Sequence, residues 1–282
     1  MHESHIILLL IEDIKKKATL KGIDDSIIKD ILKNYFNKNK KSLSKLVQYQ
    51  IEDQLKKSAE YKEVIKTIRA KLYKSYGMFQ IPKNADEIKQ RFLRKLSVGQ
   101  ETNEDYKQVF SLHLSTKERF QYYPFIYQQI FKKIKPKIIL DLGCGLNPLS
   151  YHYMNTNAKY IASDIDKVNL VFIQKFFELS GIDGKILILN LENETDLQKL
   201  AFIDCDVCFM FKLLETDKRL AEPLVTTVNA KIIVASFSTI SLTGKIMSSP
   251  EREWFEKMLS RLKYKFSTFK TGNEIFYIIR KS

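Results

Sequence analysis

The chain has 282 residues, of which 44% are hydrophobic and 28% are charged, so it can form one large domain or two smaller ones with a sizeable core. No apolar run approaches the ~18–20 residues needed to cross a membrane, and the run at residues 6–11 is too short, and too soon followed by acids, for a signal peptide. The three cysteines (Cys144, Cys205 and Cys208) form no matched pairs, which favours a reducing, cytoplasmic setting. We expect neither a membrane anchor nor a metal site.

The net charge of +14 is unevenly distributed along the chain. Residues 1–137 hold 29 Lys and Arg against 16 Asp and Glu, whereas residues 138–282 hold 18 against 17. A basic half joined to a neutral half favours a polyanion, above all a nucleic acid, as the partner of the first half. Lysine-rich helices that merely face solvent are the alternative.

The first 110 residues are predicted to be helical, because apolar residues recur at spacings of three and four. Asp24, Asp25 and Ser26 form a plausible cap for the second helix. We therefore predict a basic helical extension over residues 1–110. Helices are predicted at residues 6–17, 26–37, 42–55, 59–76 and 86–96, with another beginning near residue 103.

The pattern changes after Pro136, where short β-branched apolar runs begin to alternate with helical segments such as 168–180. Alternating strand and helix predicts a mostly parallel sheet covered on both faces, that is, a Rossmann-like α/β domain over residues 111–282. The last two runs flank a Gly-Asn turn and predict an antiparallel hairpin. Strands are predicted at residues 137–141, 160–164, 186–190, 207–211, 230–237, 265–270 and 274–280.

A glycine loop follows the first predicted strand, with the sequence Asp141-Leu142-Gly143-Cys144-Gly145. Two glycines let the backbone turn sharply beside a ligand. A dinucleotide-binding loop would carry a third glycine where Pro148 stands, and Asp141 would repel a phosphate. Asp164, at the end of the second strand, is placed to bind both hydroxyls of a ribose. The loop therefore predicts S-adenosylmethionine, a nucleoside with a cationic amino-acid end and no phosphate.

Three more positions belong to this pocket by topology, since ligands of open α/β sheets bind at the carboxyl ends of the strands. Asn190 ends the third strand and could bond the edge of the adenine ring, with Leu191 beside it. Lys212 follows the fourth strand, on the predicted floor where the methyl group is transferred.

Four ordered motifs make the chain resemble the 16S rRNA guanine-N7 methyltransferases that confer aminoglycoside resistance. The most specific is Gly-Cys-Gly-Leu-Asn-Pro, because it is not the general methyltransferase pattern. The four motifs are residues 143–148, His-Leu-Ser-Thr-Lys-Glu-Arg at 113–119, Ser236-Phe237 with Ser-Leu-Thr-Gly-Lys at 241–245 and Trp254-Phe255, and Gly-Asn-Glu-Ile-Phe-Tyr-Ile at 272–278.

The resemblance implies S-adenosylmethionine-dependent methylation of guanine N7 in small-subunit rRNA, at the aminoglycoside-binding decoding site. It implies that Arg119 holds the carboxylate of the cofactor, which a guanidinium can do with two parallel bonds. It also implies a helical extension that docks on the small ribosomal subunit. We expect a monomer in which no general base is required. The residues expected to bind the RNA substrate are Lys38, Lys40, Lys41, Phe237 and Trp254.

Other functions stay open. The target could be another position in rRNA or tRNA, and a small-molecule methyltransferase would share the pocket, although it would not need a basic extension. A non-catalytic RNA-binding protein is disfavoured by the intact Asp141, Gly143, Gly145 and Asp164.

Overall fold

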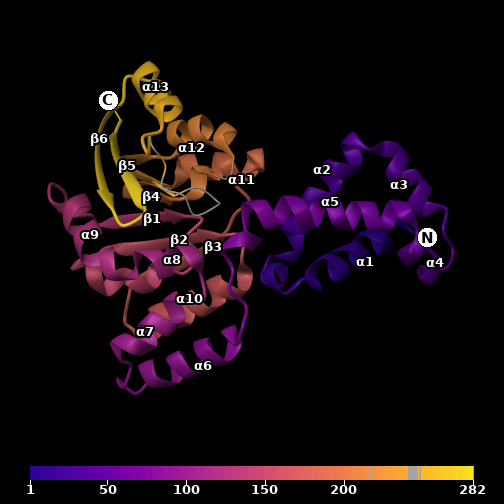
Figure 1. Cartoon of the computed structure of the whole chain (residues 1–282), viewed down its shortest axis with the longest axis horizontal. Helices are drawn as coiled ribbons and strands as arrows, with labels where there is room; N and C mark the ends of the chain where they lie inside the picture. The colour runs from indigo at the N-terminus through magenta and orange to yellow at the C-terminus, as the bar shows by residue number, and fades with distance from the viewer. Residues whose placement is uncertain (216, 241–246, 248, 282) are drawn as a thin grey trace. The chain divides into compact units, whose positions relative to one another are not determined.

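The computed structural model describes residues 1–215, 217–240, 247 and 249–281 (Figure 1). The chain forms two compact units. The first comprises Met1–Pro82 together with Ile165–Val168, and the second comprises Lys83–Asp164 and the described residues from Asn169 onward. This division differs from the predicted boundary at residue 110, because Phe92 and Phe110 are buried in the same core as the sheet. Helical periodicity shows which face of a helix is buried, but not in which core.

The N-terminal unit is a group of amphipathic helices. Ile6, Leu10 and Ile14 lie one turn apart on the first helix, α1, and are fully buried, and α1 packs against the long helix α5. The Asp24 side chain caps α2 by accepting from the Ser26 amide, as predicted. The helices of this unit are α1 (Glu3–Lys15), α2 (Asp25–Lys38), α3 (Lys40–Val47), α4 (Glu52–Lys57) and α5 (Ala59–Ser75).

One predicted helix of this unit is wrong. The single helix expected at residues 42–55 is two helices, α3 and α4, because the backbone of Ile51 is extended between them. Glu52 and Asp53 stand in the first turn of α4, where acidic side chains favour the start of a new helix.

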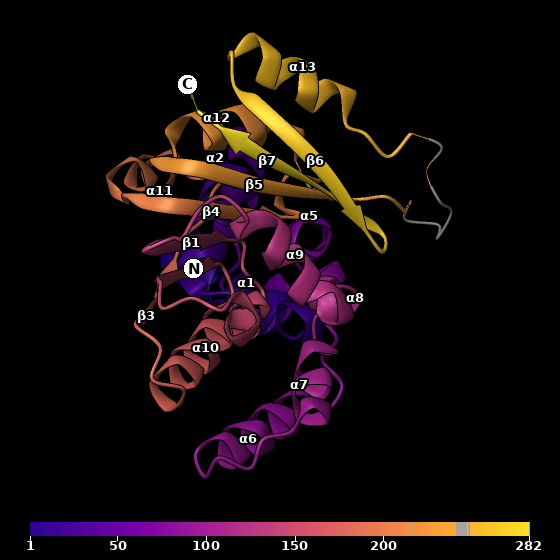
Figure 2. The same cartoon turned by 90° about the vertical axis from the view of Figure 1, so that its left-hand side faces the viewer.

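The second unit is built on a seven-stranded sheet in the order β3-β2-β1-β4-β5-β7-β6 (Figures 1 and 2). The first five strands in this order are parallel, and β7 and β6 are antiparallel, as predicted. The strands are β1 (Ile138–Leu142), β2 (Lys159–Asp164), β3 (Gly184–Ile188), β4 (Cys205–Phe211), β5 (Ala230–Ser238), β6 (Lys265–Thr271) and β7 (Glu274–Arg280).

Helices cover both faces of the sheet (Figure 2). One hydrophobic core joins the sheet to α6, α7, α9 and α10, and a second joins it to α12 and α13. None of the described helices is both long and apolar enough to cross a membrane. The helices of this unit are α6 (Ala85–Leu96), α7 (Asn103–Phe110), α8 (Leu114–Arg119), α9 (Tyr123–Phe131), α10 (Lys167–Leu179), α11 (Glu194–Lys199), α12 (Ala221–Thr227), α13 (Glu253–Arg261) and the 3-10 helix η4 (Asn147–Met154).

Candidate active site

The loop after β1 requires glycine at two positions. Gly143 and Gly145 have φ angles of 62° and 51°, in the left-handed region that side chains rarely adopt. A Cβ atom on Gly143 would lie 2.8 Å from Leu213 Cδ1, and one on Gly145 would lie 2.8 Å from His113 Nε2. A side chain at either position would therefore strain the backbone and displace a neighbouring side chain.

Asp164 anchors this loop. It is the last residue of β2, and its carboxylate accepts a hydrogen bond of 2.8 Å from the Gly145 amide. The Cys144 amide donates to the carbonyl of Ser163 at 3.0 Å. The structure thus brings together the glycine loop and the acid that the sequence analysis assigned to one pocket. A carboxylate held in this way at the carboxyl edge of a sheet suits the two hydroxyls of a ribose.

Asp141 lies fully buried beneath the loop. Burial raises the pKa of this carboxyl to about 6, although hydrogen bonds from the Tyr160 hydroxyl (2.6 Å) and the Asn147 amide (2.9 Å) favour the carboxylate. Two buried oxygens nearby, Asn147 Oδ1 and Ser163 Oγ, have no hydrogen-bond partner within the described part of the chain. An acid poised to ionise and two unpaired acceptors fit a ligand that carries a cationic amine.

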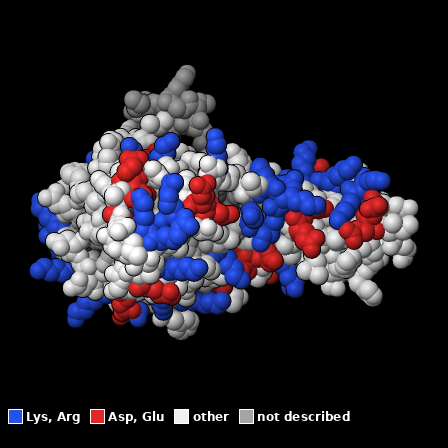
Figure 3. Space-filling model, turned by 90° about the horizontal axis from the view of Figure 1, so that it is seen from below, with Lys and Arg blue, Asp and Glu red and all other residues white. Residues whose placement is uncertain are grey.

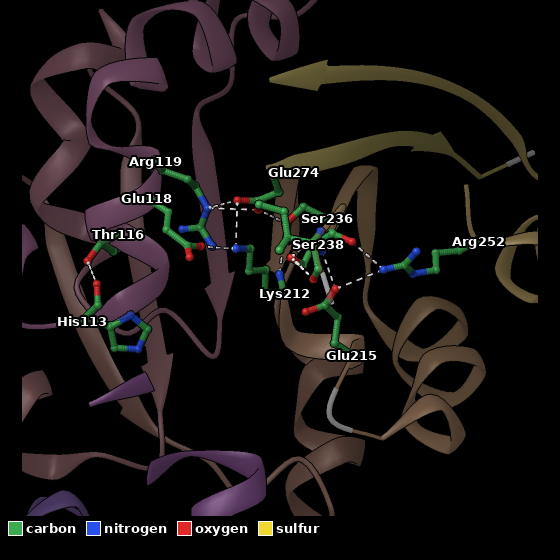
Figure 4. Close-up of polar contacts among 11 residues, drawn as sticks. His113, Thr116, Glu118, Arg119, Lys212, Glu215, Ser236, Ser238, Arg252 and Glu274 are labelled. Atoms are coloured by element: carbon green, nitrogen blue, oxygen red, sulfur yellow. Dashed lines mark hydrogen bonds and ion pairs between the residues drawn. The ribbon is translucent and has the colours of Figure 1, made fainter. Parts of the chain in front are cut away.

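A buried group of charges lies beside α8 (Figure 4). Arg119 Nε donates to both carboxylate oxygens of Glu274, at 3.0 and 2.9 Å, and the Ser236 hydroxyl also donates to Glu274. The Lys212 ammonium pairs with Glu118 and lies 3.8 Å from Glu274. Burial disfavours the charged guanidinium, but Glu274 outweighs it and the pKa of Arg119 is raised. Two cations and two anions compensate one another here, so the group can be buried.

A second polar group lies at the carboxyl end of β5 (Figure 4). Glu215 accepts from the Ser238 amide and lies 3.5 Å from Arg252 Nη2, while Arg252 also donates to the Ser238 carbonyl at 2.6 Å. Burial raises the pKa of Glu215. The end of β5 is therefore held by the side chain of Arg252, which precedes α13, and by Glu215 from the segment after β4.

The other residues expected to line the pocket are Lys212 at its floor and Asn190 with Leu191 at the adenine ring. Lys212 has a left-handed backbone (φ 54°), and its amide donates to the Ser236 carbonyl at 3.1 Å, so the chain turns sharply after β4. Its ammonium is buried in ion pairs. The side-chain Oδ1 of Asn190 accepts from the Glu192 amide at 3.1 Å, which shapes a turn after β3, and Leu191 is buried beside it.

The two aromatic residues expected to contact RNA, Phe237 and Trp254, differ in burial. Phe237 is fully buried and meets Phe255 and Tyr277 edge to face, so its proposed contact with a base is wrong in this arrangement. Trp254 is half-buried, with the Lys218 ammonium 5.2 Å from the centre of its ring. Its contact with RNA stays a prediction. Residues 241–245 of the third motif lie outside the described residues.

The lysines predicted to contact RNA are exposed. Lys38 ends α2, and Lys40 and Lys41 begin α3. Sequence analysis assigns no role of their own to three acids of these two groups, Glu118, Glu215 and Glu274. Glu118 and Glu274 stand inside two of the motifs quoted for the resemblance, and this was the only signal that could have found them.

Comparison with known protein sequences identifies relatives of the chain. The model of the ribosomal RNA methyltransferase (FmrO) family matches residues 41–278. The chain is 30% identical over 234 residues to a 16S rRNA (guanine(1405)-N(7))-methyltransferase of Micromonospora rosea, covering 78% of this chain and 83% of the relative. It is 29% identical over 236 residues to a protein of the same description from Serratia marcescens, covering 78% and 84%.

Solved structures share the fold. The 16S rRNA methyltransferase RmtF, in complex with S-adenosyl-L-homocysteine, covers 100% of both chains with a TM-score of 0.74 and 19% identity. The 16S rRNA methylase ArmA covers 69% of this chain and 98% of its own, with a TM-score of 0.54 and 29% identity. A match over most of the chain, on a fold whose glycine loop and Asp164 are hydrogen-bonded, leads to one conclusion: the chain belongs to the FmrO family of ribosomal RNA methyltransferases.

Proposed function

We propose that the protein transfers the methyl group of S-adenosylmethionine to N7 of a guanine in small-subunit rRNA, at the aminoglycoside-binding decoding site. The activity for which the relatives are named, methylation of guanine 1405 of 16S rRNA at N7, supports this target. The observation that carries the proposal is the glycine loop hydrogen-bonded to Asp164, because this arrangement supports a nucleoside site in which Asp141 would repel a phosphate. The enzyme acts in the cytoplasm as a monomer, with the small ribosomal subunit as its partner.

The residues present fit the cofactor. Asp164 would hold the ribose hydroxyls, and Asn190 and Leu191 the adenine. The carboxylate of Asp141 would favour the cationic amine, and Arg119 would take the carboxylate through the guanidinium nitrogens that lie beyond its bond to Glu274. The bound cofactor supplies a sulfonium methyl group.

Methylation at N7 places few chemical demands on the protein. N7 of guanine carries a lone pair and no proton, so no general base is required. His113 is half-buried, and desolvation lowers its pKa to about 3, which keeps the imidazole neutral, while Cys144 is buried in the loop. These residues are structural. The protein contributes by positioning the reactants and excluding water, and by holding a base extruded at a cost of roughly a few kcal/mol.

The pH dependence of cofactor binding tests the role of Asp141. In the free protein this carboxyl keeps its proton below about pH 6, and a bound cation lowers its pKa, so binding releases a proton. The affinity for S-adenosylmethionine is expected to rise between pH 5 and pH 7, as measured by calorimetry. In Asp141→Asn the rise should disappear. A wild-type affinity that is flat over this window would contradict the role.

The exposed lysines of the N-terminal unit are proposed to bind phosphates. Replacing Lys38, Lys40 and Lys41 with Ala is expected to weaken binding to small subunits and to make its salt dependence shallower by about 2, since each phosphate contact contributes ~0.7–0.9 to the slope. Filter binding at several KCl concentrations measures both.

The matched control for this variant replaces three lysines whose charge a carboxylate already neutralises. These are Lys16, Lys45 and Lys56, which pair with Asp13, Glu60 and Glu52. The control should change the slope less. Equal slopes for wild type and the Lys38, Lys40 and Lys41 variant would remove this cluster from the interface.

The target nucleotide is tested by mapping N7-methylguanine on rRNA from cells with and without the gene, using reduction, aniline cleavage and primer extension. One new cleavage in the decoding site of small-subunit rRNA is expected. A cleavage elsewhere in rRNA or tRNA would move the target. No methyl transfer to any RNA, with cofactor binding intact, would favour a small-molecule substrate.

A further inference from the structure

A groove lies at the end of the sheet where the parallel strands begin. The Gly143–Gly145 loop lies at the opposite end, where these strands finish. Its walls are α9 from Pro124 to Phe131, the segment at residues 132–137 that leads into β1, and residues 151–157, which lead into β2. Its volume is about 1270 Å³. The first residues of the two strands, Ile138 and Lys159, are register partners, so both segments reach the same edge. The five residues of β1 separate this edge from the loop by roughly 16 Å. We call it the amino-edge groove.

The charge of the amino-edge groove is uncompensated. Three exposed lysines line it (Lys132, Lys135 and Lys137), and no Asp or Glu does. No ion pair of these lysines occurs among the described residues. Blue side chains lie at the left margin of Figure 3, on the side where Figure 1 places α9.

Several other lysines of this unit pair with carboxylates. Lys95 pairs with Asp105 and Lys270 with Glu251. Asp206, which binds the Lys137 backbone amide through one oxygen, pairs with Lys231 through the other. The carboxylate of Asp206 is thus already engaged, and positive charge gathered in a concave surface favours a polyanion.

The remaining walls of the groove are aromatic and amide-rich. The Tyr151 hydroxyl donates to the Ala158 carbonyl at 2.7 Å, which fixes a half-buried ring at the wall. The centres of the His152 and Tyr153 rings lie 3.8 Å apart. Asn155 and Asn157 are exposed. Lysines for phosphates, amides for sugar hydroxyls and aromatic rings for bases together match RNA, whereas a flat lipid surface would call for a protruding apolar face.

We propose that the amino-edge groove binds the phosphate backbone of a second segment of small-subunit rRNA, separate from the segment that carries the methylated guanine. The inference rests on the proposed function. The target base must reach the carboxyl edge of the sheet, where Asp164 and the glycine loop lie, so RNA in the groove at the opposite edge is a different segment. Contact at two edges makes binding depend on the folded arrangement of the rRNA.

The test uses the full chain with Lys132, Lys135 and Lys137 all replaced by Ala. These side chains are exposed, so the melting temperature and the affinity for S-adenosylmethionine should match the wild type. Filter binding to small subunits between 50 and 200 mM KCl is expected to show a tenfold or greater loss of affinity and a slope shallower by about 2 to 3. The KM for subunits should rise by a similar factor.

The matched control replaces three exposed lysines on separate elements of the same unit, Lys175 of α10, Lys185 of β3 and Lys265 of β6. It removes the same charge, and its slope should stay near the wild-type value. An equal loss in control and groove variants would overturn the proposal by showing a general charge effect. A salt-dependence slope in the groove variant equal to that of the wild type would overturn it too. So would a groove variant that loses binding to phosphatidylglycerol vesicles while it keeps its affinity for small subunits.

The two proposals can fail separately. A wild-type protein that binds subunits through the amino-edge groove but leaves N7 of guanine unmethylated would contradict only the proposed function. Methylation at N7 together with a groove variant that binds subunits as wild type does would contradict only the groove.

Discussion

Asp164→Ala is expected to reduce the affinity for S-adenosylmethionine at least 100-fold, which corresponds to about 2.7 kcal/mol. The carboxylate has two roles that alanine cannot fill: it accepts the 2.8 Å bond from the Gly145 amide, and it would hold the ribose. Hydrogen bonds to a charged group contribute roughly 1.5–3 kcal/mol each. Calorimetry with S-adenosylmethionine and with S-adenosylhomocysteine measures the loss.

RNA binding separates this effect from misfolding. The lysines proposed to contact rRNA lie on other elements, so the Asp164→Ala variant should bind small subunits nearly as well as the wild type. Asp164→Asn keeps an oxygen that can accept from Gly145, and it should lose less cofactor affinity than Asp164→Ala. Equal loss of cofactor and subunit binding would show damage to the fold and would undermine the site assignment.

Glu274→Ala is expected to lower the free energy of unfolding by about 3 kcal/mol or more. It would leave Arg119, which is 3% exposed, without the carboxylate whose two oxygens both accept from its Nε, and removing one member of a buried pair costs roughly 3–5 kcal/mol. The Lys212 ammonium would keep only Glu118. Urea unfolding of the free protein measures the change.

A double variant separates stability from binding at this pair. In Arg119→Met with Glu274→Met no unpaired charge remains, so much of the lost stability should return, because apolar side chains of similar size often replace buried ion pairs at little cost. The affinity of the double variant for S-adenosylmethionine should be lower than that of the wild type, since the residue proposed to hold the cofactor carboxylate is gone. Full recovery of affinity would exclude Arg119 from the cofactor site, and a Glu274→Ala protein as stable as the wild type would show that the pair contributes little.

The sheet and the main part of the site follow from local sequence. Short β-branched runs predicted all seven strands, and their order fixed the carboxyl edge where Asp141, the glycine loop and Asp164 meet. These residues lie at the ends of consecutive strands, so a rule about strand ends was enough to bring them together.

The charge group beside α8 does not follow from local sequence. Glu118 and Lys212 are 94 residues apart, and Arg119 and Glu274 are 155 apart, so no spacing rule connects them. Residue type was equally insufficient for Phe237, since an aromatic ring serves a core as well as it serves an RNA base. The break between α3 and α4 depends on how two short amphipathic segments pack, which periodicity alone does not reveal.

The long separation of Arg119 and Glu274 links cofactor binding to the integrity of the whole sheet unit. The pair needs α8 and β7 in place at once, so a chain that has lost either element no longer has the complete pocket. A small molecule bound there selects the native state, and at one hundred times its dissociation constant it adds about 2.7 kcal/mol to the unfolding free energy. The methyl donor is in this sense also a folding ligand, and cells depleted of it would hold a less stable enzyme.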